Sequence, residues 1–435
     1  MLKKLFKFFL FLVLALVTFL SLHSHARDFR WEKKISEGID YIHIKKFTDP
    51  GWLHTHILKI DLQRHDIDVK PALAKDTIGM LEPVNATAKR WNAIAAINGS
   101  FFEARKRPYL PIGIIAIDGK MVNKSTLSRC AFGITAGKDI IFGVPNIKSK
   151  FVLLAKNKSF DIWGINRPRK NNEVILYTNE YGKRTKTNQY GIEIIVTKGE
   201  VSSILRAKGN SVIPEDGYVI SLHGVSRKYA DWIILGDEVL IEIDLGKPWQ
   251  MMNHIVSGGP LLIRDGKIVV KKTVIEEDFE GRLLKRSART AIGETVDKKL
   301  MLVVVDKRRW ISSGLFYSEL AQVMLEEGAR NAMALDGGSS STMYVDGSIV
   351  NYPSAGKAVA VSNAIIVKKA GWRLVAKKPI AFVKKPAEDV KKRIPFVEVT
   401  SKEAAEVPLP PTGLMDIYDR VIRILWVTGE AMIED

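Results

Sequence analysis

The sequence predicts an α+β fold in which strands predominate, arranged as mixed sheets with a few packed helices. Between about residues 41 and 367, apolar segments alternate with glycine-centred turns, and only a few segments carry a helical period. The chain has 435 residues, of which 46% are hydrophobic, so it can bury a sizeable core as one large domain or two ordinary ones.

Two segments are predicted to be β-hairpins. "PIGIIAIDGKMV" (111–122) and "GGPLLIRDGKIVV" (258–270) each place two apolar runs around an Asp-Gly turn, and their likeness suggests two related halves. "GDEVLIEIDL" (236–245) alternates as a half-buried strand does, whereas "KLMLVVVD" (299–306) is continuously apolar, which is typical of a strand buried on both faces.

The strongest helical signal lies in "FYSELAQVMLEEGAR" (316–330). Leu320, Val323 and Met324 share one face of this predicted helix, and Gly328 is placed to end it. The chain then enters "AMALDGG", so we expect Asp336 where a strand ends and a loop begins. Functional groups often occupy such positions, because the strand fixes where the loop starts.

The first 26 residues predict an export signal. Three lysines precede an apolar run, and small residues then occupy the positions that signal peptidase prefers, with cleavage expected after Ala26. The protein is therefore expected to be periplasmic or secreted. The alternative is an uncleaved membrane anchor, although the run is shorter than the ~20 residues of a spanning helix.

The rest of the chain divides by composition. We expect a strand-rich N-terminal part at 27–84, a catalytic domain at 85–367, a basic proline-containing linker at 368–411 and an amphipathic helix at 412–435. The helix either docks on the domain or anchors to a surface or partner. The basic linker could bind an anionic membrane or envelope polymer, but nucleic acid is disfavoured because no interleaved aromatic and basic motif accompanies the charge.

The glycine and hydroxyl cluster after Asp336 is the first candidate site. Two glycines let the backbone turn its N–H groups toward one point, and short hydroxyl side chains follow, which suits an anion held beside a carboxylate. The alternative is a polar turn whose hydroxyls bond their own backbone. The candidate binding residues are Gly337, Gly338, Ser340, Ser341 and Thr342.

Two further clusters carry candidate residues. Arg289 and Thr290 precede the buried strand, where an arginine can bind phosphate or form a salt bridge within the core, with Asp336 as one partner. Asn98 and Gly99 end another apolar strand and either bind substrate or make the turn. His223 and His254 are titratable candidates that are more often structural, and the single Cys130 is expected in the core.

These motifs together resemble the phosphodiester glycosidase family. The resemblance is carried, in order, by "AINGSFF…PIGIIAIDGK", "GYVISLHG", "SGGPLLIRDGK", "ARTAIG…LMLVVVD", "ELAQVMLEEGARNAMALDGGSSSTM" and "NYPS…VSNAIIV". It covers roughly residues 85 to 367. It implies an α+β hydrolase that removes a sugar from a sugar-1-phosphodiester, with N-acetylglucosamine as one candidate sugar, and adds Asn363 of the VSN motif to the binding residues.

The chain departs from the family pattern at three places. Ala288 stands where the family usually has proline, and "DKR" (306–308) stands where it often has Asp-Gly-Arg. The family often has an arginine four residues before the asparagine of the VSN motif, and Val359 occupies that position here. If that arginine binds phosphate, this chain must use another group or another substrate.

The expected chemistry follows from the leaving group. A phosphate leaves as a weakly basic anion, so holding its charge and activating the attacker matter more than protonating it. We expect Arg289 and the N–H groups around Gly337 and Gly338 to hold the phosphate. Asp336 is then the base or nucleophile, and Glu103 is the candidate second carboxylate.

Two other expectations complete the sequence picture. No cofactor is required, and no His, Cys or acidic spacing gives a zinc signature, although a calcium or magnesium ion at Asp336 is compatible with the acidic glycine-rich loop. The competing functional class is a non-catalytic binder of anionic envelope polysaccharide, which Val359 favours.

Overall fold

The computed structural model describes residues 28–279, 281 and 285–369. The predicted export signal (1–26), almost all of the predicted linker (368–411) and the predicted C-terminal helix (412–435) lie outside the described residues. Strands dominate the described part, which confirms the strand-rich fold class. The printed strand pairings are antiparallel apart from β13 with β14, so the sheet that holds this pair is mixed.

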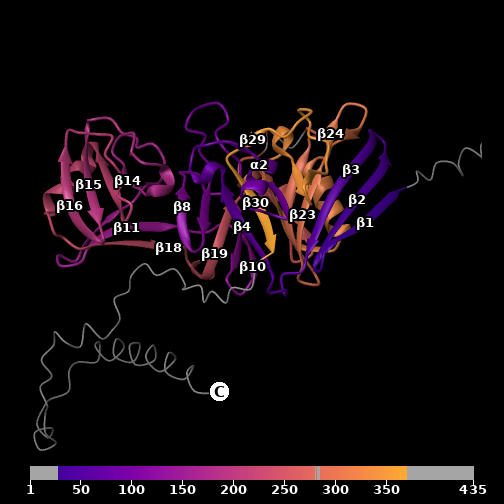
Figure 1. The fold of residues 1–435 in the computed structure, drawn as a ribbon, viewed down its shortest axis with the longest axis horizontal. Helices are drawn as coiled ribbons and strands as arrows, with labels where there is room; N and C mark the ends of the chain where they lie inside the picture. Colours follow the sequence, from indigo (N-terminus) through magenta and orange to yellow (C-terminus); the bar gives the residue numbers. More distant parts are fainter. Residues whose placement is uncertain (1–27, 280, 282–284, 370–435) are drawn as a thin grey trace, which may run out of the picture. The chain divides into compact units, whose positions relative to one another are not determined.

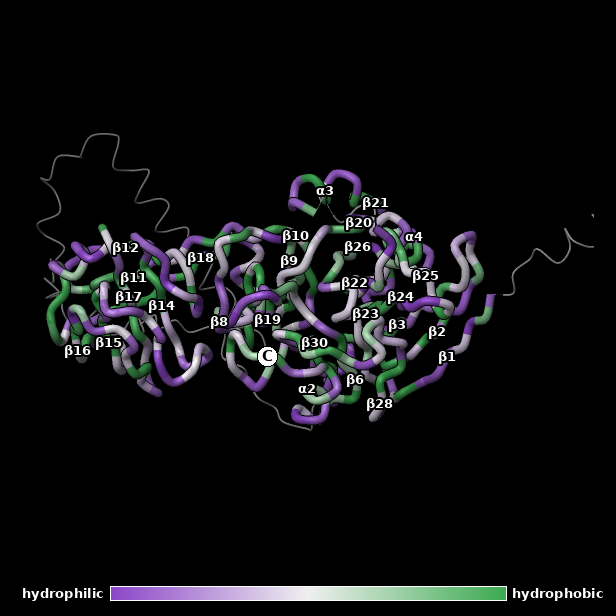
Figure 2. The backbone as a smooth tube through the Cα atoms, turned by 90° about the horizontal axis from the view of Figure 1, so that it is seen from above, coloured by the Kyte–Doolittle hydropathy of each residue, from purple (hydrophilic) through white to green (hydrophobic). Residues whose placement is uncertain are grey.

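The first sheet joins the N-terminal strands to strands from residues 261–334 (Figure 1). Its outermost strand β1 is exposed and charged, and it is largely purple in Figure 2. Such an edge resists pairing with other chains. The order is β1 (Phe29–Ser36), β2 (Ile39–Thr48), β3 (Gly51–Ile60), β23 (Leu300–Val305), β22 (Arg289–Thr295), β26 (Ala329–Ala334), β20 (Leu261–Arg264) and β21 (Lys267–Ile268).

A ten-stranded sheet contains the first predicted hairpin. Beside it, β11 (Lys148–Leu153), β12 (Lys158–Asp161) and β18 (Val239–Asp244) form a separate three-stranded sheet. The order of the large sheet is β10 (Ile140–Gly143), β9 (Ala131–Thr135), β19 (Met252–Ser257), β7 (Ile114–Ile117), β8 (Lys120–Lys124), β13 (Gly164–Ile165), β14 (Val174–Tyr177), β17 (Gly217–His223), β15 (Gly191–Thr197) and β16 (Glu200–Arg206).

A five-stranded sheet carries the strand that ends at Asn98. Two small pairs, β29 (Ala360–Val361) with β5 (Glu82–Pro83) and β24 (Lys307–Arg308) with β25 (Ser312–Ser313), complete the pairing. The order of the five-stranded sheet is β28 (Ser348–Ile349), β27 (Met343–Val345), β6 (Ala95–Asn98), β30 (Asn363–Lys369) and β4 (Ile67–Leu73).

The eight-stranded sheet is covered on both faces. On one face its side chains pack with the helices α3 (Val270–Glu276) and α4 (Tyr317–Glu326), and on the other they pack with the five-stranded sheet and with β9 and β19. The helix α2 (Val84–Arg90) packs on the five-stranded sheet. Two-sided burial explains why every residue of β23 is buried, as its continuous apolar sequence predicts.

The predicted local elements form with small differences. The Asp118-Gly119 and Asp265-Gly266 turns have positive φ at both residues, as tight hairpin turns require. However, the second hairpin's return strand is only Lys267–Ile268, because the chain enters α3 at Val270. Helix α4 buries Leu320 and Met324 and ends before Gly328, whose φ is +92°.

Candidate active site

The structure brings the three sequence clusters together at the ends of three strands. Asp336 follows β26, and its N–H donates to the carbonyl of Gly99 after β6 at 3.1 Å. Leu335 donates its N–H to the carbonyl of Thr290 in β22 at 2.8 Å. Segments about 240 residues apart in sequence (336 − 99 = 237) therefore meet through backbone hydrogen bonds.

Asn98 is the hub of this junction. Its side chain is fully buried, and its Nδ2 donates to the carbonyl of Asp336 at 2.6 Å. Its Oδ1 accepts from Thr290 Oγ1 at 2.9 Å and from the N–H of Thr342 at 3.1 Å. Thr290 Oγ1 also lies 3.1 Å from Ser341 Oγ. Asn98 thus fixes both ends of the loop that follows Asp336, which is more than a turn residue does.

Asn363 plays a similar part on the other side of Gly99. Its Oδ1 accepts from the N–H of Ser100 at 3.0 Å, and its Nδ2 donates to Ser100 Oγ at 2.7 Å. A Cβ at Gly99 would lie 2.0 Å from Asn363 Oδ1, so only glycine lets the two chains approach this closely. Both asparagines, predicted as binding residues, hold the loops in place by contacts inside the protein.

The loop after Asp336 is a short 3₁₀ turn over Gly338–Ser340. Gly338 has φ of +66°, and its N–H donates to the carbonyl of Ala288 at 2.8 Å. This N–H is therefore committed to the backbone and is not the phosphate donor that the glycine pattern suggests. The side chains of Ser340, Ser341 and Thr342 are buried. Of their hydroxyl groups, that of Ser341 contacts Thr290 Oγ1, as given above, and Ser340 lines the cavity described next.

Asp336 opens into a cavity of about 570 Å³, named here the Asp336 cavity. The loop 336–340 forms one wall, and aromatic side chains from two other segments form another. Phe101 and Phe279 lie with their ring centroids 5.4 Å apart. Apolar rings beside a carboxylate and hydroxyl groups are usual in pockets that bind a small organic ligand.

Arg289 does not line this cavity. It is 4% exposed, its Nε donates to the carbonyl of Leu315 at 2.9 Å, and one Nη donates to the carbonyl of Lys285 at 2.9 Å. Its guanidinium lies 3.8 Å from the ring centroid of Tyr317. These contacts brace the start of β22 and the start of α4, so the structure favours a supporting position for Arg289.

Among the residues that the structure describes, Arg129 is the cation that lines the Asp336 cavity, and the sequence motifs did not single it out. Its guanidinium lies 4.3 Å from the ring centroid of Phe279, and one Nη donates to the carbonyl of Glu277. Val359 lines the same cavity. The position where the family often has arginine is thus in the wall of the Asp336 cavity. In this chain Arg129, from a different segment, brings a guanidinium to the same cavity.

Among the described residues, the second carboxylate that lines the cavity is Asp278 rather than Glu103. Asp278 lines the Asp336 cavity after α3, while Glu103 is exposed and lines a neighbouring cavity. No motif marks Asp278, because an acidic residue after a short helix is common. The adjacent Glu277 is buried and accepts from the N–H groups of Leu261 and Cys130, and burial raises the pKa of its carboxyl.

Behind the loop lies a buried polar chain that the motifs did not predict. Asp306 is fully buried; its carboxylate lies 3.0 Å from His56 Nε2 and accepts from Asn351 Nδ2 at 2.9 Å. Asn351 in turn accepts the N–H of Met343 at 2.8 Å and donates to the carbonyl of Ser341 at 3.2 Å. The chain from His56 to Asn351 therefore braces the far end of the Asp336 loop. The sequence feature that could have indicated this chain of contacts is the alternation of histidines in β3.

The two histidine candidates lie outside the Asp336 cavity. His254 is buried and its Nδ1 accepts from the N–H of Asp118 at 3.1 Å, which is a structural role in the hairpin turn. Burial and the charge of Arg169 lower the pKa of His223. Among the described residues no group of three or more His, Cys, Asp or Glu side chains is arranged to hold a metal ion. Cys130 is buried, as expected.

Comparison with known proteins relates the chain to phosphodiester glycosidases. The phosphodiester glycosidase family model matches residues 190–368. N-acetylglucosamine-1-phosphodiester alpha-N-acetylglucosaminidase from Bos taurus is 34% identical over 109 residues, which are 23% of this chain and 20% of the relative. The Mus musculus protein of the same name is 32% identical over 167 residues, 37% of this chain and 31% of the relative. The chain thus spans about a fifth to a third of these relatives.

Solved structures share the fold. A Synechocystis protein superposes with a TM-score of 0.69 at 22% identity, covering 78% of this chain and 64% of that one. A Burkholderia pseudomallei K96243 protein, provisionally described as exported, superposes with a TM-score of 0.68 at 18% identity, covering 79% of this chain and 97% of that one. No helix within the described residues is long and apolar enough to span a membrane. The resemblance of this chain to the phosphodiester glycosidase family is therefore confirmed, through a family model matched over residues 190–368.

Proposed function

We propose that this protein is an exported hydrolase that cleaves the bond between the anomeric carbon of a sugar and a phosphate in a glycan phosphodiester. The observation that carries the proposal is the Asp336 cavity, in which a carboxylate and the guanidinium-bearing Arg129 line one space beside aromatic rings. The family match and the relatives named for phosphodiester cleavage support the same reaction class.

The reaction needs an attacker at carbon and a cation at phosphate. Asp336 either removes a proton from water, which then bonds to the anomeric carbon, or attacks that carbon itself. In both cases the carbon–oxygen bond breaks and its electron pair stays on the phosphate oxygen, which leaves as a phosphomonoester. Arg129 is the proposed phosphate ligand, because it lines the cavity and Arg289 does not.

Asp278 is the proposed second carboxylate. A retaining mechanism needs Asp336 as nucleophile and Asp278 to activate the water that releases the sugar, whereas an inverting mechanism needs one carboxylate as base. The stereochemistry of the first sugar released, followed by NMR, separates these two routes. The identity of the sugar is a further proposal, for which N-acetylglucosamine is the first compound to try because the named relatives act on it.

The test is sugar release from a panel of α- and β-linked sugar-1-phosphodiesters. We expect Asp336→Asn to abolish release and Arg129→Gln to lower kcat/KM. Urea unfolding of both variants is measured beside the assay, because Arg129→Gln also removes the contact with the Phe279 ring and the hydrogen bond to the Glu277 carbonyl. Adding an arginine at the family position, as Val359→Arg in the Arg129→Gln background, should restore part of the activity. Unchanged release by Asp336→Asn would contradict the assignment.

The alternative is a binder of anionic envelope polysaccharide that does not turn it over. Val359 favours it, because the family's usual cavity arginine is missing. A binder would hold polymer with the same affinity before and after Asp336→Asn and would release no sugar from any member of the panel. The export signal, which either role requires, is tested by N-terminal sequencing of the protein recovered outside the cytoplasm.

A further inference from the structure

Three cavities on this protein adjoin one another. The Asp336 cavity shares Arg129 with a second cavity of about 370 Å³, which Lys124 also lines. This second cavity shares Ser125, Thr126 and Leu127 with a third one of about 380 Å³. Ile112 lines both the first and the third of these cavities. The three cavities therefore adjoin one another through common wall residues, and together they are named here the groove.

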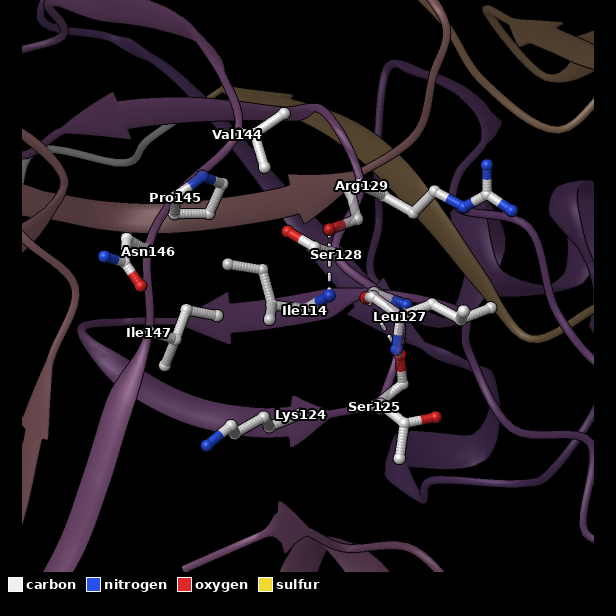
Figure 3. Close-up of a pocket in the computed structure, with 13 residues that line it drawn as sticks. Ile114, Lys124, Ser125, Leu127, Ser128, Arg129, Val144, Pro145, Asn146 and Ile147 are labelled. Atoms are coloured by element: carbon white, nitrogen blue, oxygen red, sulfur yellow. Dashed lines mark hydrogen bonds between the residues drawn. The ribbon is translucent and has the colours of Figure 1, made fainter. Parts of the chain in front are cut away.

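The middle of the groove is shown in Figure 3. The side chain of Arg129 extends away from Lys124 and from the segment Val144–Ile147, in keeping with its place in the wall of the Asp336 cavity. Lys124 lies on the other side, where its Nζ donates to Ser149 Oγ at 2.6 Å and to the carbonyl of Ile162 at 3.1 Å. The Asp336 cavity and the second cavity thus each have a cation in their walls.

The third cavity is strongly basic and is named here the basic cavity. Its wall contains five cationic side chains and one acid, and the acid is Glu103. One cation, Arg167, is neutralised by a buried salt bridge to Glu173 at 2.7 Å. The cations that have no salt bridge to a carboxylate of the described residues are Lys106, Arg107, Arg169 and Lys170.

The charge of the basic cavity is only partly balanced, as the contacts of Arg169 show. Arg169 spends its Nη groups on the neutral acceptors Ser221 Oγ, at 2.7 Å, and Asn188 Oδ1, at 2.9 Å. Burial lowers the pKa of its guanidinium, which means that this cation is less well stabilised here than in water. An anion bound in the basic cavity would offset that cost.

The loop between β6 and β7 ties the basic cavity to the reacting centre. Phe102 and Ala104 of this loop line the Asp336 cavity, while Lys106 and Arg107 line the basic cavity. The loop is closed at its base by hydrogen bonds from the N–H of Glu103 to the carbonyl of Leu110, at 2.9 Å, and from Ile112 to Phe101, at 2.8 Å. One short loop therefore forms a wall of both cavities.

We propose that the basic cavity binds a second phosphate of the same glycan chain, so that the substrate is a polymer with repeating phosphodiesters rather than a small sugar phosphodiester. This inference rests on the proposed function and deepens it. The sugar to be released occupies the Asp336 cavity, and the chain on the phosphate side runs through the groove past Lys124. Cations in each of the three adjoining cavities match an anionic group that recurs along a polymer.

The test compares two substrates of one linkage: a single sugar-1-phosphodiester and a short oligomer of the same unit. The full chain is compared with a triple variant, Lys106→Ala with Arg107→Ala and Lys170→Ala, which changes only exposed side chains. A matched control removes one arginine and two lysines from exposed positions outside all three cavities, as Lys208→Ala with Lys271→Ala and Arg309→Ala.

We expect the parent and the control to prefer the oligomer, and the triple variant to lose about tenfold in kcat/KM for the oligomer, as the loss of three part-exposed charge contacts implies. Its kcat/KM for the single unit should not change. An equal loss on both substrates, or an oligomer preference that survives in the triple variant, would overturn the proposal.

A binding measurement separates this proposal from the catalytic one. Calorimetry measures the affinity of the Asp336→Asn protein for the oligomer, with and without the triple change. It shows how much the basic cavity contributes to binding when no turnover takes place. Weaker binding caused by the triple change supports the second phosphate site even if no sugar is released from any substrate. Unchanged binding overturns it even if Asp336 proves catalytic.

Discussion

Replacing Asn98 by alanine tests whether one buried side chain holds the candidate site together. The change removes hydrogen bonds to the Asp336 carbonyl, to Thr290 Oγ1 and to the N–H of Thr342. At about 1 kcal/mol each, with about 1 kcal/mol more for the small void, the free energy of unfolding should fall by about 4 kcal/mol. Turnover should fall about 100-fold, because displacing a reacting group by about 1 Å has this effect.

The assay must separate lost stability from lost geometry. Asn166→Ala is the matched control, because Asn166 is also fully buried and bonds the carbonyl of Val122, at 2.9 Å, and both N–H and Oγ1 of Thr178. It does not line the Asp336 cavity. Its positive φ of 55° adds about 1 kcal/mol of strain for alanine, so the control loses at least as much stability.

Both variants are measured by urea unfolding and by sugar release at a temperature where each is folded. We expect similar losses of stability and a loss of kcat only in Asn98→Ala. If Asn98→Ala kept the parent kcat while losing stability, the idea that this hub positions Asp336 would be refuted. If it lost no stability, the hydrogen bonds assigned to Asn98 would be absent from the protein in solution.

Two other predictions concern packing and acid. Gly99→Ala should destabilise the protein by about 1–3 kcal/mol, because its Cβ would meet Asn363 Oδ1, whereas Gly137→Ala, whose Cβ meets only ordinary contacts, should be near neutral in the same unfolding assay. Burial lowers the pKa of His43 to about 4, whereas the ordinary histidine pKa is about 6.5. Between these two pH values the unfolded chain binds a proton at His43 that the folded protein does not. The free energy of unfolding therefore falls as the pH falls through this window. Since His43 is only half-buried, we expect a loss of about 1–2 kcal/mol across that window, and His43→Gln should flatten the curve; an unchanged slope would contradict it.

Much of the local structure could be predicted because it depends on neighbours in sequence. The Asp-Gly turns, the doubly buried strand β23 and the stop of α4 before Gly328 follow from residue type and period alone. Residue type alone does not indicate that the Asp336, Thr290 and Asn98 clusters meet in space, and they were assigned to one site through the family resemblance. The sheet to which each hairpin belongs depends on partners far along the chain, so no local pattern could give it.

The roles inside the site were harder to predict than its location. Arg289 was expected at the phosphate because arginine before an apolar pair is a common anion ligand, but its guanidinium is held by the carbonyls of Leu315 and Lys285. Arg129 and Asp278 have no motif around them and enter the cavity only through the fold. Asp306 was noted only as the first residue of a segment that departs from the family pattern, although its carboxylate braces the loop through Asn351.

The position of β23 also constrains how the chain reaches its folded state. β3 is synthesised long before β23, yet residues 55–60 of β3 pair with the whole length of β23, so this part of the sheet must wait for a partner from the last third of the chain. Until then six consecutive apolar residues without proline or charge, Leu300 to Val305, form a segment of the kind that nucleates aggregation. A fragment trimmed to residues 190–368 would lack β3 and expose that edge permanently, so insolubility of the fragment would reflect a missing strand rather than an unstable catalytic core.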